Sequence, residues 1–279
     1  MIEIRELTKK FGDFTAVDHL NLTIETGEFF GLLGPNGAGK TTTISMISTV
    51  LLPNSGEILV NGKPLDRRAS EIKRRISVIT QEYSMRMDMT CDEVMEYQGR
   101  LYYMPIKEIR EKTDDLLDFV GLTEFRKRRV RNLSGGMKRR LMICRALMTD
   151  PEIILLDEPT AGMDAIARRQ TWGILKELHN RGITILLTTH YMEEAEALCD
   201  RVALIDSGKL STINTPEGLI DELGKFAVDK TVDGKIESRF FADRQDAIDY
   251  LTGEEDADMR NTTLEDVFIQ RIGKALMRK

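Results

Sequence analysis

A glycine-rich stretch of nine residues constrains this chain more than any other feature of its sequence. It is Gly34-Pro35-Asn36-Gly37-Ala38-Gly39-Lys40-Thr41-Thr42, and it follows an apolar run at 29–33 that is typical of a buried strand. Apolar residues at helical spacing come directly after it, namely Ile44, Ile47 and Leu51. A strand, a glycine turn and a helix in this order bring backbone N–H groups to a helix N-terminus, which favours anions. The stretch therefore predicts a phosphate-binding loop, and the alternative is a turn that binds nothing.

Two side chains of this stretch have the chemistry that a nucleoside triphosphate requires. Lys40 supplies a positive charge for the β- and γ-phosphates, and the Thr41 hydroxyl is an oxygen ligand for Mg²⁺. We therefore expect a nucleotide-binding α/β fold in which the loop joins a strand to a helix.

Polar side chains follow three further apolar runs. Gln81 follows residues 76–80, Asp157 and Glu158 follow residues 153–156, and His190 follows residues 183–189. Open α/β sheets bind ligands at the carboxyl ends of their strands, so we expect these side chains near the phosphates. Two carboxylates at the end of a buried strand are costly unless a metal or a polar network receives them. We assign Asp157 to the magnesium shell and Glu158 to the activation of a water molecule.

The composition limits the classes of protein to consider. Of the 279 residues, 41% are hydrophobic and 31% are charged, which is typical of a globular protein with one large domain and appendages or with two domains. The formal net charge of −6 argues against a general nucleic-acid-binding surface, so we expect no nucleic-acid partner.

The expected location is the cytoplasm. No apolar run approaches the roughly 20 residues that span a bilayer, and the N-terminus lacks the hydrophobic region of a signal peptide. The cysteines, Cys91, Cys144 and Cys199, are far apart and odd in number, which favours a reducing compartment over a disulfide framework.

The first segments of the chain alternate between apolar and polar residues. Residues 2–7 and 20–24 show this pattern, which predicts strands of a sheet with one exposed face. Phe11 lies between them and is either a core residue or an aromatic face on which a purine stacks. From this segment alone the core interpretation is favoured, because burial is the default for phenylalanine.

A helical pattern from residue 82 to about 149 predicts an insertion into the α/β core. Methionines near its start suit either an adaptable docking surface or a core, and both remain open: Met85, Met87, Met89, Met95 and Met104. Ser134-Gly135-Gly136 precedes the last helix of this block. The serine can cap that helix, while the glycines leave its first N–H groups open to a phosphate.

The tail is more polar and carries no phosphate chemistry. Pro216 marks the expected boundary of a small accessory unit. We expect a strand at 235–241, a helix at 244–251, an exposed acidic loop at 253–256, and a terminal helix with Leu264, Val267, Phe268 and Ile272 on one face.

With these residues identified, the chain resembles the ATP-binding cassette (ABC) ATPases, the motor subunits of ABC transporters. The resemblance covers residues 1 to about 215 and rests on six motifs in the family's order: the loop at 34–42, Gln81, the signature Leu133-Ser134-Gly135-Gly136, residues 153–158, Asp164 and His190. Three further segments, 99–102, 133–140 and 263–268, are similar to the daunorubicin-resistance type of bacterial multidrug exporter ATPase.

The resemblance implies a fold and a mode of action. The fold is α/β, with a P-loop NTPase core (RecA-like), an antiparallel β subdomain, an inserted α-helical subdomain over about 82–149 and a small α+β C-terminal extension. The ABC ATPase domain then covers 1–215, and the C-terminal accessory region covers 216–279. Two subunits pack head to tail, so that the phosphate loop of one and the Ser134-Gly135-Gly136 segment of the other enclose each ATP.

The resemblance also implies a role for each matching position. The nucleotide-binding set is Phe11, Gly34, Pro35, Asn36, Gly37, Ala38, Gly39, Lys40, Thr41, Thr42, Ser134, Gly135, Gly136 and Asp164, with Phe11 stacked on adenine and Asp164 communicating between subunits. Thr41, Gln81 and Asp157 would hold Mg²⁺ directly or through water. Glu158 would be the general base, assisted by Gln81 and by His190 at the γ-phosphate.

We therefore expect a cytoplasmic ATPase subunit that forms a homodimer and lies on the inner face of the cell membrane through a separate integral-membrane permease, which it drives for export. One alternative is a non-transport ABC ATPase that acts on ribosomes or DNA; the acidic charge and the single cassette weigh against it. Another is a soluble assembly scaffold that binds nucleotide without useful hydrolysis; the presence of both Glu158 and His190 weighs against it.

Overall fold

The computed structural model describes residues 1–232, 234–254 and 256–273. Its centre is a six-stranded sheet in the order β10-β9-β3-β8-β7-β6, in which every neighbouring pair is parallel except β9 and β10. The strands are β3 (Phe29–Leu33), β6 (Ile76–Ile79), β7 (Ile153–Asp157), β8 (Thr184–Thr189), β9 (Arg201–Asp206) and β10 (Lys209–Asn214). Because β3, β6, β7 and β8 run in the same direction, the four polar segments expected at strand ends meet at one edge of the sheet.

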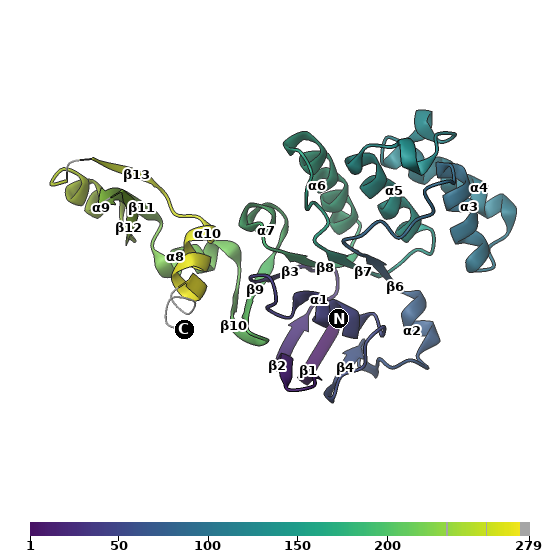
Figure 1. Ribbon diagram of the computed structural model, residues 1–279, viewed down its shortest axis with the longest axis horizontal. Coiled ribbons are helices and arrows are strands. Elements are labelled where there is room, and N and C mark those ends of the chain that lie inside the picture. The colour runs from purple at the N-terminus through teal and green to yellow at the C-terminus, as the bar shows by residue number, and fades with distance from the viewer. Residues whose placement is uncertain (233, 255, 274–279) are drawn as a thin grey trace.

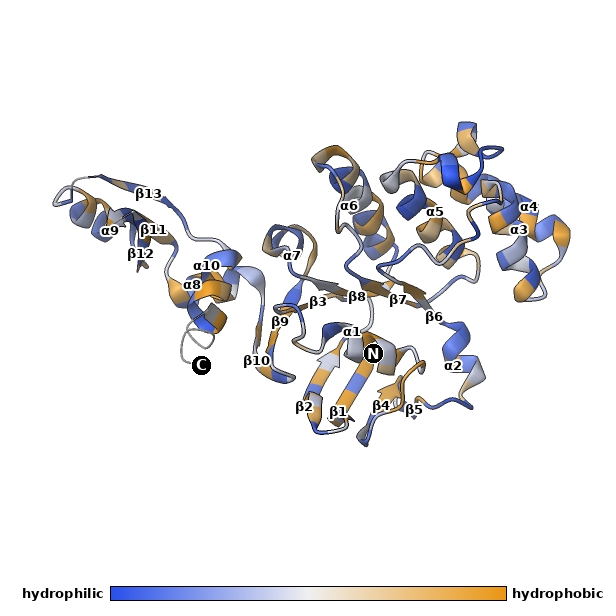
Figure 2. Cartoon of the chain, viewed as in Figure 1, coloured by the Kyte–Doolittle hydropathy of each residue, from blue (hydrophilic) through white to orange (hydrophobic). Residues whose placement is uncertain are grey.

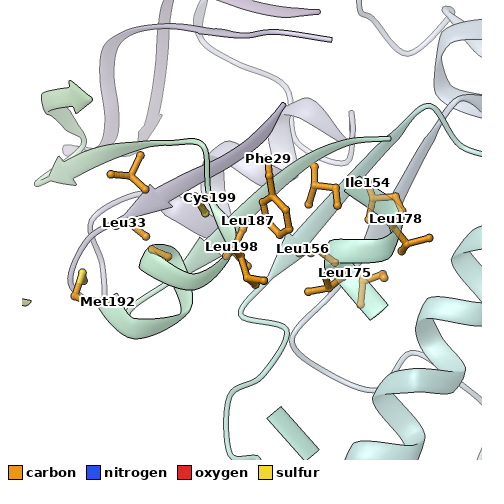
Figure 3. Packing of buried hydrophobic residues seen from close by; sticks show 14 of the residues in the cluster. Phe29, Leu33, Ile154, Leu156, Leu175, Leu178, Leu187, Met192, Leu198 and Cys199 are labelled. Carbon is orange, nitrogen blue, oxygen red and sulfur yellow. The ribbon is translucent and has the colours of Figure 1, made fainter. Parts of the chain in front are cut away.

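Side chains of the central strands alternate between two apolar layers. On one face, Phe29, Leu156 and Leu187 pack against the helices α6 (Ala165–Asn180) and α7 (Met192–Leu198), as Figure 3 shows. On the other face, Phe30 and Leu155 pack toward α1 (Lys40–Ile47) and a second sheet. Every residue of β3 and β7 is buried, which is the pattern of a strand covered on both sides.

The second sheet is antiparallel, with four strands in the order β2-β1-β4-β5. They are β1 (Ile2–Phe11), β2 (Phe14–Ile24), β4 (Ser55–Val60) and β5 (Lys63–Pro64). The alternation in the first two strands does give one buried and one exposed face, so this prediction is confirmed. In Figure 1 this sheet lies on the α1 side of the central sheet, opposite α6.

Helices fill the chain between β6 and β7 and form a lobe beside the central sheet (Figure 1). They are α3 (Cys91–Leu101), α4 (Ile106–Phe119), the short turns η1 (Thr123–Phe125) and η2 (Val130–Asn132), and α5 (Gly135–Leu147); α2 (Ser70–Arg74) precedes β6. The lobe has its own apolar cluster, and its helices alternate polar and apolar bands in Figure 2. Met95 is fully buried in that cluster, which confirms the core interpretation for this methionine, while Met87 is 38% exposed.

Residues 216–232, 234–254 and 256–273 form an α+β unit at one end of the molecule (Figure 1). It consists of α8 (Pro216–Leu223), β11 (Phe226–Val232), β12 (Lys235–Phe241), α9 (Arg244–Leu251), β13 (Ala257–Asn261), α10 (Leu264–Phe268) and a π-helical turn η3 (Ile269–Gly273). The expected strand and helix at 235–251 are confirmed, whereas β11 and β13 were not expected. Glu255 of the acidic loop lies outside the described residues, as do residues 233 and 274–279.

The accessory unit is attached to the core through apolar side chains. Leu264, Val267 and Ile272 are buried in the same cluster as α7, which confirms that they share one face. Within the unit, the guanidinium of Arg260 donates hydrogen bonds to Asp229 (2.7 Å) and to Asp266 (2.6 and 2.8 Å). This paired charge ties β11 and β13 to α10.

Two further observations concern the helices and the cysteines. Throughout the described ranges, every helix is too short or too polar to cross a membrane. Cys91, Cys144 and Cys199 are all free thiols and all buried.

Candidate active site

A cleft of about 470 Å³ opens at the sheet edge where β3, β6, β7 and β8 end. Its lining comprises Phe11, Phe14, Ala16, Asn36, Gly37, Ala38, Gly39, Lys40, Thr41, Thr42, Gln81, Glu158, Ala161 and His190. The fold thus brings together side chains from five separate segments of the chain, most of which the sequence singled out.

The glycine loop is shaped to surround an anion. Gly39 has a φ of +105°, and a Cβ on it would lie 2.4 Å from the carbonyl oxygen of Ala16, so no other residue fits there. A Cβ on Gly34 would lie 2.3 Å from the carbonyl oxygen of Ile205. Helix α1 begins at Lys40 with no side-chain cap and no acidic residue in its first turn. Its N-terminal N–H groups therefore suit a phosphate.

Lys40 is held inside this loop. It is 5% exposed, and its Nζ donates to the carbonyl oxygens of Gly34 (2.8 Å) and Pro35 (3.1 Å). Nζ also lies 3.8 Å from Oε1 of Glu158. Burial lowers the pKa of Lys40, and the nearby carboxylates of Glu158 and Asp157 oppose that shift. The ammonium is thus held at the mouth of the loop, where its positive charge suits a multiply charged anion.

Oxygen atoms that suit Mg²⁺ lie at the start of α1 and the end of β7. The Thr41 hydroxyl donates to Oδ1 of Asp157 at 3.1 Å, and the Thr188 hydroxyl donates to the same oxygen at 2.6 Å. Nowhere in the described ranges do three His, Cys, Asp or Glu side chains gather in a metal-binding group. A site with one hydroxyl and one carboxylate fits Mg²⁺, which keeps several waters and takes further oxygens from substrate phosphates.

Glu158 and His190 form a pair in the lining of the cleft. Oε2 of Glu158 lies 2.9 Å from Nδ1 of His190, and Glu158 is only 8% exposed. The backbone of Glu158 has a φ of +48°, an uncommon conformation for this residue type, and its N–H donates to the carbonyl oxygen of Thr188 (3.0 Å). Such a backbone persists where its surroundings impose it, as they do at many active sites.

The signature segment does not line this cleft. Ser134 caps α5 as expected, since its Oγ accepts the Met137 N–H at 3.2 Å. Ser134 and Gly135 are both exposed at the helix N-terminus. Asp164 is also exposed outside the cleft and caps α6 by accepting the Ala167 N–H at 2.8 Å. One chain therefore presents two separate halves of the expected nucleotide site.

The core interpretation of Phe11 is wrong. Its side chain is 50% exposed and lines the cleft, because it ends β1 at a hairpin where no second layer covers it. Phe14, which the sequence reasoning missed, pairs with Phe11 across the hairpin and is 61% exposed. The signal was present in the sequence: the intervening Gly12-Asp13 predicts a tight turn that places the two residues opposite each other.

Arg139 is the second residue that the sequence reasoning missed. It is 2% exposed, and its guanidinium donates to the carbonyl oxygens of Thr80 (2.6 Å), Gln81 (3.1 Å) and Glu158 (3.4 Å). It thereby joins α5 to the ends of β6 and β7. A signal existed here too, because Arg139 falls on the apolar face of its helix, at helical spacing from Met142 and Ile143.

A glycine loop at a strand end, a hydroxyl and carboxylate pair beside it and a second carboxylate paired with histidine define a P-loop nucleotide hydrolase. The particular family follows from comparison. The family model described as ABC transporter matches residues 17–161, slightly more than half of the chain, and the chain belongs to this family. It is an ATP-binding cassette ATPase, which binds ATP with Mg²⁺ and hydrolyses it.

Three known proteins illustrate the similarity. The Nod factor export ATP-binding protein I of Cupriavidus metallidurans is 42% identical over 225 residues, which cover 80% of this chain and 74% of that protein. The linearmycin resistance ATP-binding protein LnrL of Bacillus subtilis is 40% identical over 224 residues, covering 80% and 72%. A dimeric ATP-binding cassette in a post-hydrolysis state with ADP and Pi superimposes with a TM-score of 0.69 at 28% identity, covering 77% of this chain and 98% of that one.

Proposed function

We propose that this ATPase works as a head-to-tail homodimer that drives a separate membrane permease for export. The observation that carries the proposal is the separation, within one chain, of the phosphate loop from the exposed signature segment Ser134-Gly135-Gly136. The similar cassette of known structure is a dimer, and two similar relatives are named for export and for drug resistance.

The dimer follows from the chemistry of the two halves. The N-terminus of α5 has no acidic residue in its first turn, so its N–H groups and helix dipole favour a negative charge. In a head-to-tail pair that charge is the γ-phosphate held by the loop of the other subunit. Asp164 and the 73% exposed Ile166 extend the same surface, which suits a subunit contact. Binding of ATP then closes the dimer, and loss of the γ-phosphate releases it.

The roles of the site residues follow from their places in the cleft. We assign the phosphates to the loop at 34–42 with Lys40, and the adenine to the exposed face of Phe11. Thr41, Asp157 and Gln81 would hold Mg²⁺, which supplies charge neutralisation at the phosphates. Glu158 accepts the proton of the attacking water, and His190 orients Glu158 through the 2.9 Å contact.

A groove of about 510 Å³ beside the helical lobe is the proposed docking site for the permease. Its lining combines apolar and basic side chains: Tyr83, Ser84, Met85, Arg86, Met89, Val94, Tyr97, Gln98, Leu101 and Arg145. Tyr97 and Leu101 are about half exposed, which is unusual for side chains with this much apolar surface. Tyr83 connects the groove to the signature segment, since its hydroxyl donates to the carbonyl oxygen of Gly135 at 3.2 Å. A cytoplasmic loop of the permease seated here would sense closure of the dimer.

The same proposal divides the chain and places it in the cell. Residues 1–215 are the ATPase domain with its helical subdomain at about 82–149, and residues 216–279 are the accessory region. The protein acts at the cytoplasmic face of the membrane, to which the permease attaches it.

The substitution Glu158→Gln tests the hydrolytic part of the proposal. It removes the proton acceptor and keeps the shape, so ATP affinity should persist while kcat falls by about 10² or more. The matched control is Glu152→Gln, an exposed glutamate just before β7 whose side chain pairs with the surface residue Arg75. Undiminished turnover in Glu158→Gln would remove Glu158 from the role of general base.

A further inference from the structure

A buried carboxylate with no role in the proposed chemistry lies behind the catalytic loop. Glu194 belongs to α7, four residues after His190, and is 0% exposed. Its Oε1 accepts hydrogen bonds from the Thr160 hydroxyl (2.7 Å) and from the Trp172 indole N–H (3.1 Å). One carboxylate oxygen thus joins α7, the loop after Glu158 and helix α6.

Burial of the Glu194 carboxylate at this position is energetically unfavourable. Its Oε2 is buried and, within the described part of the chain, has no hydrogen-bond partner; the same holds for Nε of Arg168. Burial raises the pKa of Glu194, and the neighbouring side chains of Thr160, Thr189 and Trp172 and the charge of Arg168 act against that shift. A buried carboxylate with one unpaired oxygen costs stability relative to a well-packed apolar side chain. Stability alone therefore does not account for a glutamate here.

Thr160 is the point at which the catalytic loop turns toward α6. The Ala161 N–H donates to the carbonyl oxygen of Glu158 (3.3 Å), and the Met163 N–H donates to that of Thr160 (3.2 Å). Glu158 has a left-handed backbone conformation, which is strained for a glutamate and persists only where contacts from surrounding residues hold it in place. His190 contacts the side chain of Glu158, and Glu194 contacts Thr160 two residues later, so His190 and Glu194 hold the loop at two points.

Helix α7 is anchored to the core by apolar side chains. Met192 and Leu198, at its two ends, point into the apolar cluster beside the central sheet (Figure 3). This close packing fixes the position of α7, and therefore of Glu194, relative to the central sheet.

We propose that Glu194 is a positioning residue for ATP hydrolysis, which holds the loop at 158–164 through Thr160 so that Glu158 faces the γ-phosphate and Asp164 faces the partner subunit. This rests on the proposed function, in which Glu158 is the general base. Glu194 makes no contact with the cleft, so its loss affects turnover and leaves ATP affinity intact.

Steady-state ATPase measurements on variants of the contact test the proposal. Thr160→Val is isosteric and removes only the donor to Glu194; it should lower kcat about tenfold or more, with KM for ATP within about twofold of wild type. Glu194→Ala should do the same, and Glu194→Gln, which keeps an oxygen acceptor, should restore most of the lost kcat. The matched control is Glu193→Gln on the same helix, whose side chain is 64% exposed and whose kcat should not change.

The single tryptophan of the chain supplies an independent readout. Trp172 loses its hydrogen-bond acceptor in Glu194→Ala, which should shift its fluorescence emission, whereas Thr160→Val leaves that bond and the spectrum in place. An unchanged spectrum together with a lowered kcat in Thr160→Val therefore separates displacement of the loop from unfolding.

Two results for Thr160→Val would overturn the proposal: an unchanged kcat, or a raised KM for ATP at unchanged kcat. An equal fall of kcat in Glu193→Gln would overturn it as well. Because Thr160→Val adds and removes almost no volume, it decides the question even where Glu194→Ala does not fold. Full turnover in Glu158→Gln would contradict the proposed function instead, so the two failures are distinguishable.

Discussion

Replacement of Arg139 by methionine removes a side chain that ties helix α5 to two of the catalytic strand ends. The guanidinium donates to Thr80 at 2.6 Å, to Gln81 at 3.1 Å and more weakly to Glu158 at 3.4 Å. Each hydrogen bond from a charged group contributes about 1.5–3 kcal/mol, so the two shorter bonds together contribute roughly 3–6 kcal/mol. Burial of the guanidinium is itself unfavourable, as the lowered pKa of Arg139 indicates. Because methionine carries no charge, the variant avoids this desolvation penalty, which offsets part of the loss.

We therefore expect Arg139→Met to lower the free energy of unfolding by about 2–4 kcal/mol, measured by urea denaturation. Its kcat should fall about tenfold or more, because the backbones of Gln81 and Glu158 lose a common anchor. The matched control is Arg140→Met, the next residue of the helix, which makes a single bond to the carbonyl oxygen of Val120 at 2.7 Å. That variant should lose about 1–2 kcal/mol and keep its kcat. Equal losses of stability and turnover in the two variants would refute this reasoning.

Two further predictions concern the adenine contact and the thiols. Phe11→Ala should raise KM for ATP about tenfold at unchanged kcat in steady-state assays, because base stacking contributes about 1–3 kcal/mol, and Phe11→Tyr should stay near wild type; equal KM values in all three proteins would exclude the contact. Burial raises the pKa of Cys91 from 9.0 to about 11, and it also raises the pKa of Cys144 and Cys199. The folded state thus prefers the neutral thiol, so the native protein should show no fast-reacting thiol toward a disulfide reagent at pH 8 and three after unfolding. The corresponding stability is present below pH 9 and lost as the pH rises from 9 toward 11, which denaturation at those pH values would measure.

The central fold could be predicted from the sequence because its signals are local. The glycine loop, the fully apolar strands and the polar residue after each strand are properties of short segments. Parallel strands bring their carboxyl ends together at one edge of the sheet. The proximity of Lys40, Asp157, Glu158 and His190 can therefore be predicted without a model of the long-range packing.

The contacts that hold the site could not be predicted in the same way. Arg139 reaches carbonyl oxygens 58 and 59 residues away, and Glu194 reaches Thr160 across 34 residues. Every residue has a backbone carbonyl group, so the sequence does not indicate which carbonyl oxygen will accept such a bond. Phe11 was misjudged because a general preference for burial was applied to a residue at a hairpin end. Strands β11 and β13 include the charged residues Asp229, Lys230 and Arg260, which interrupt the apolar alternation expected of a strand. These charges are paired within the C-terminal unit, and such pairing cannot be read from the sequence.

Mixing two inactive variants tests most directly whether two subunits share each ATP. Lys40→Ala disables the phosphate loop. Gly135→Asp puts a negative charge at the exposed N-terminus of α5, where a new Cβ meets only the Tyr83 hydroxyl, at 3.3 Å. Each variant alone should be nearly inactive. In an equimolar mixture half of the dimers contain both variants and each of these has one intact site, so ATPase activity should return to about a quarter of the wild-type value. A mixture as inactive as its components would contradict the shared site.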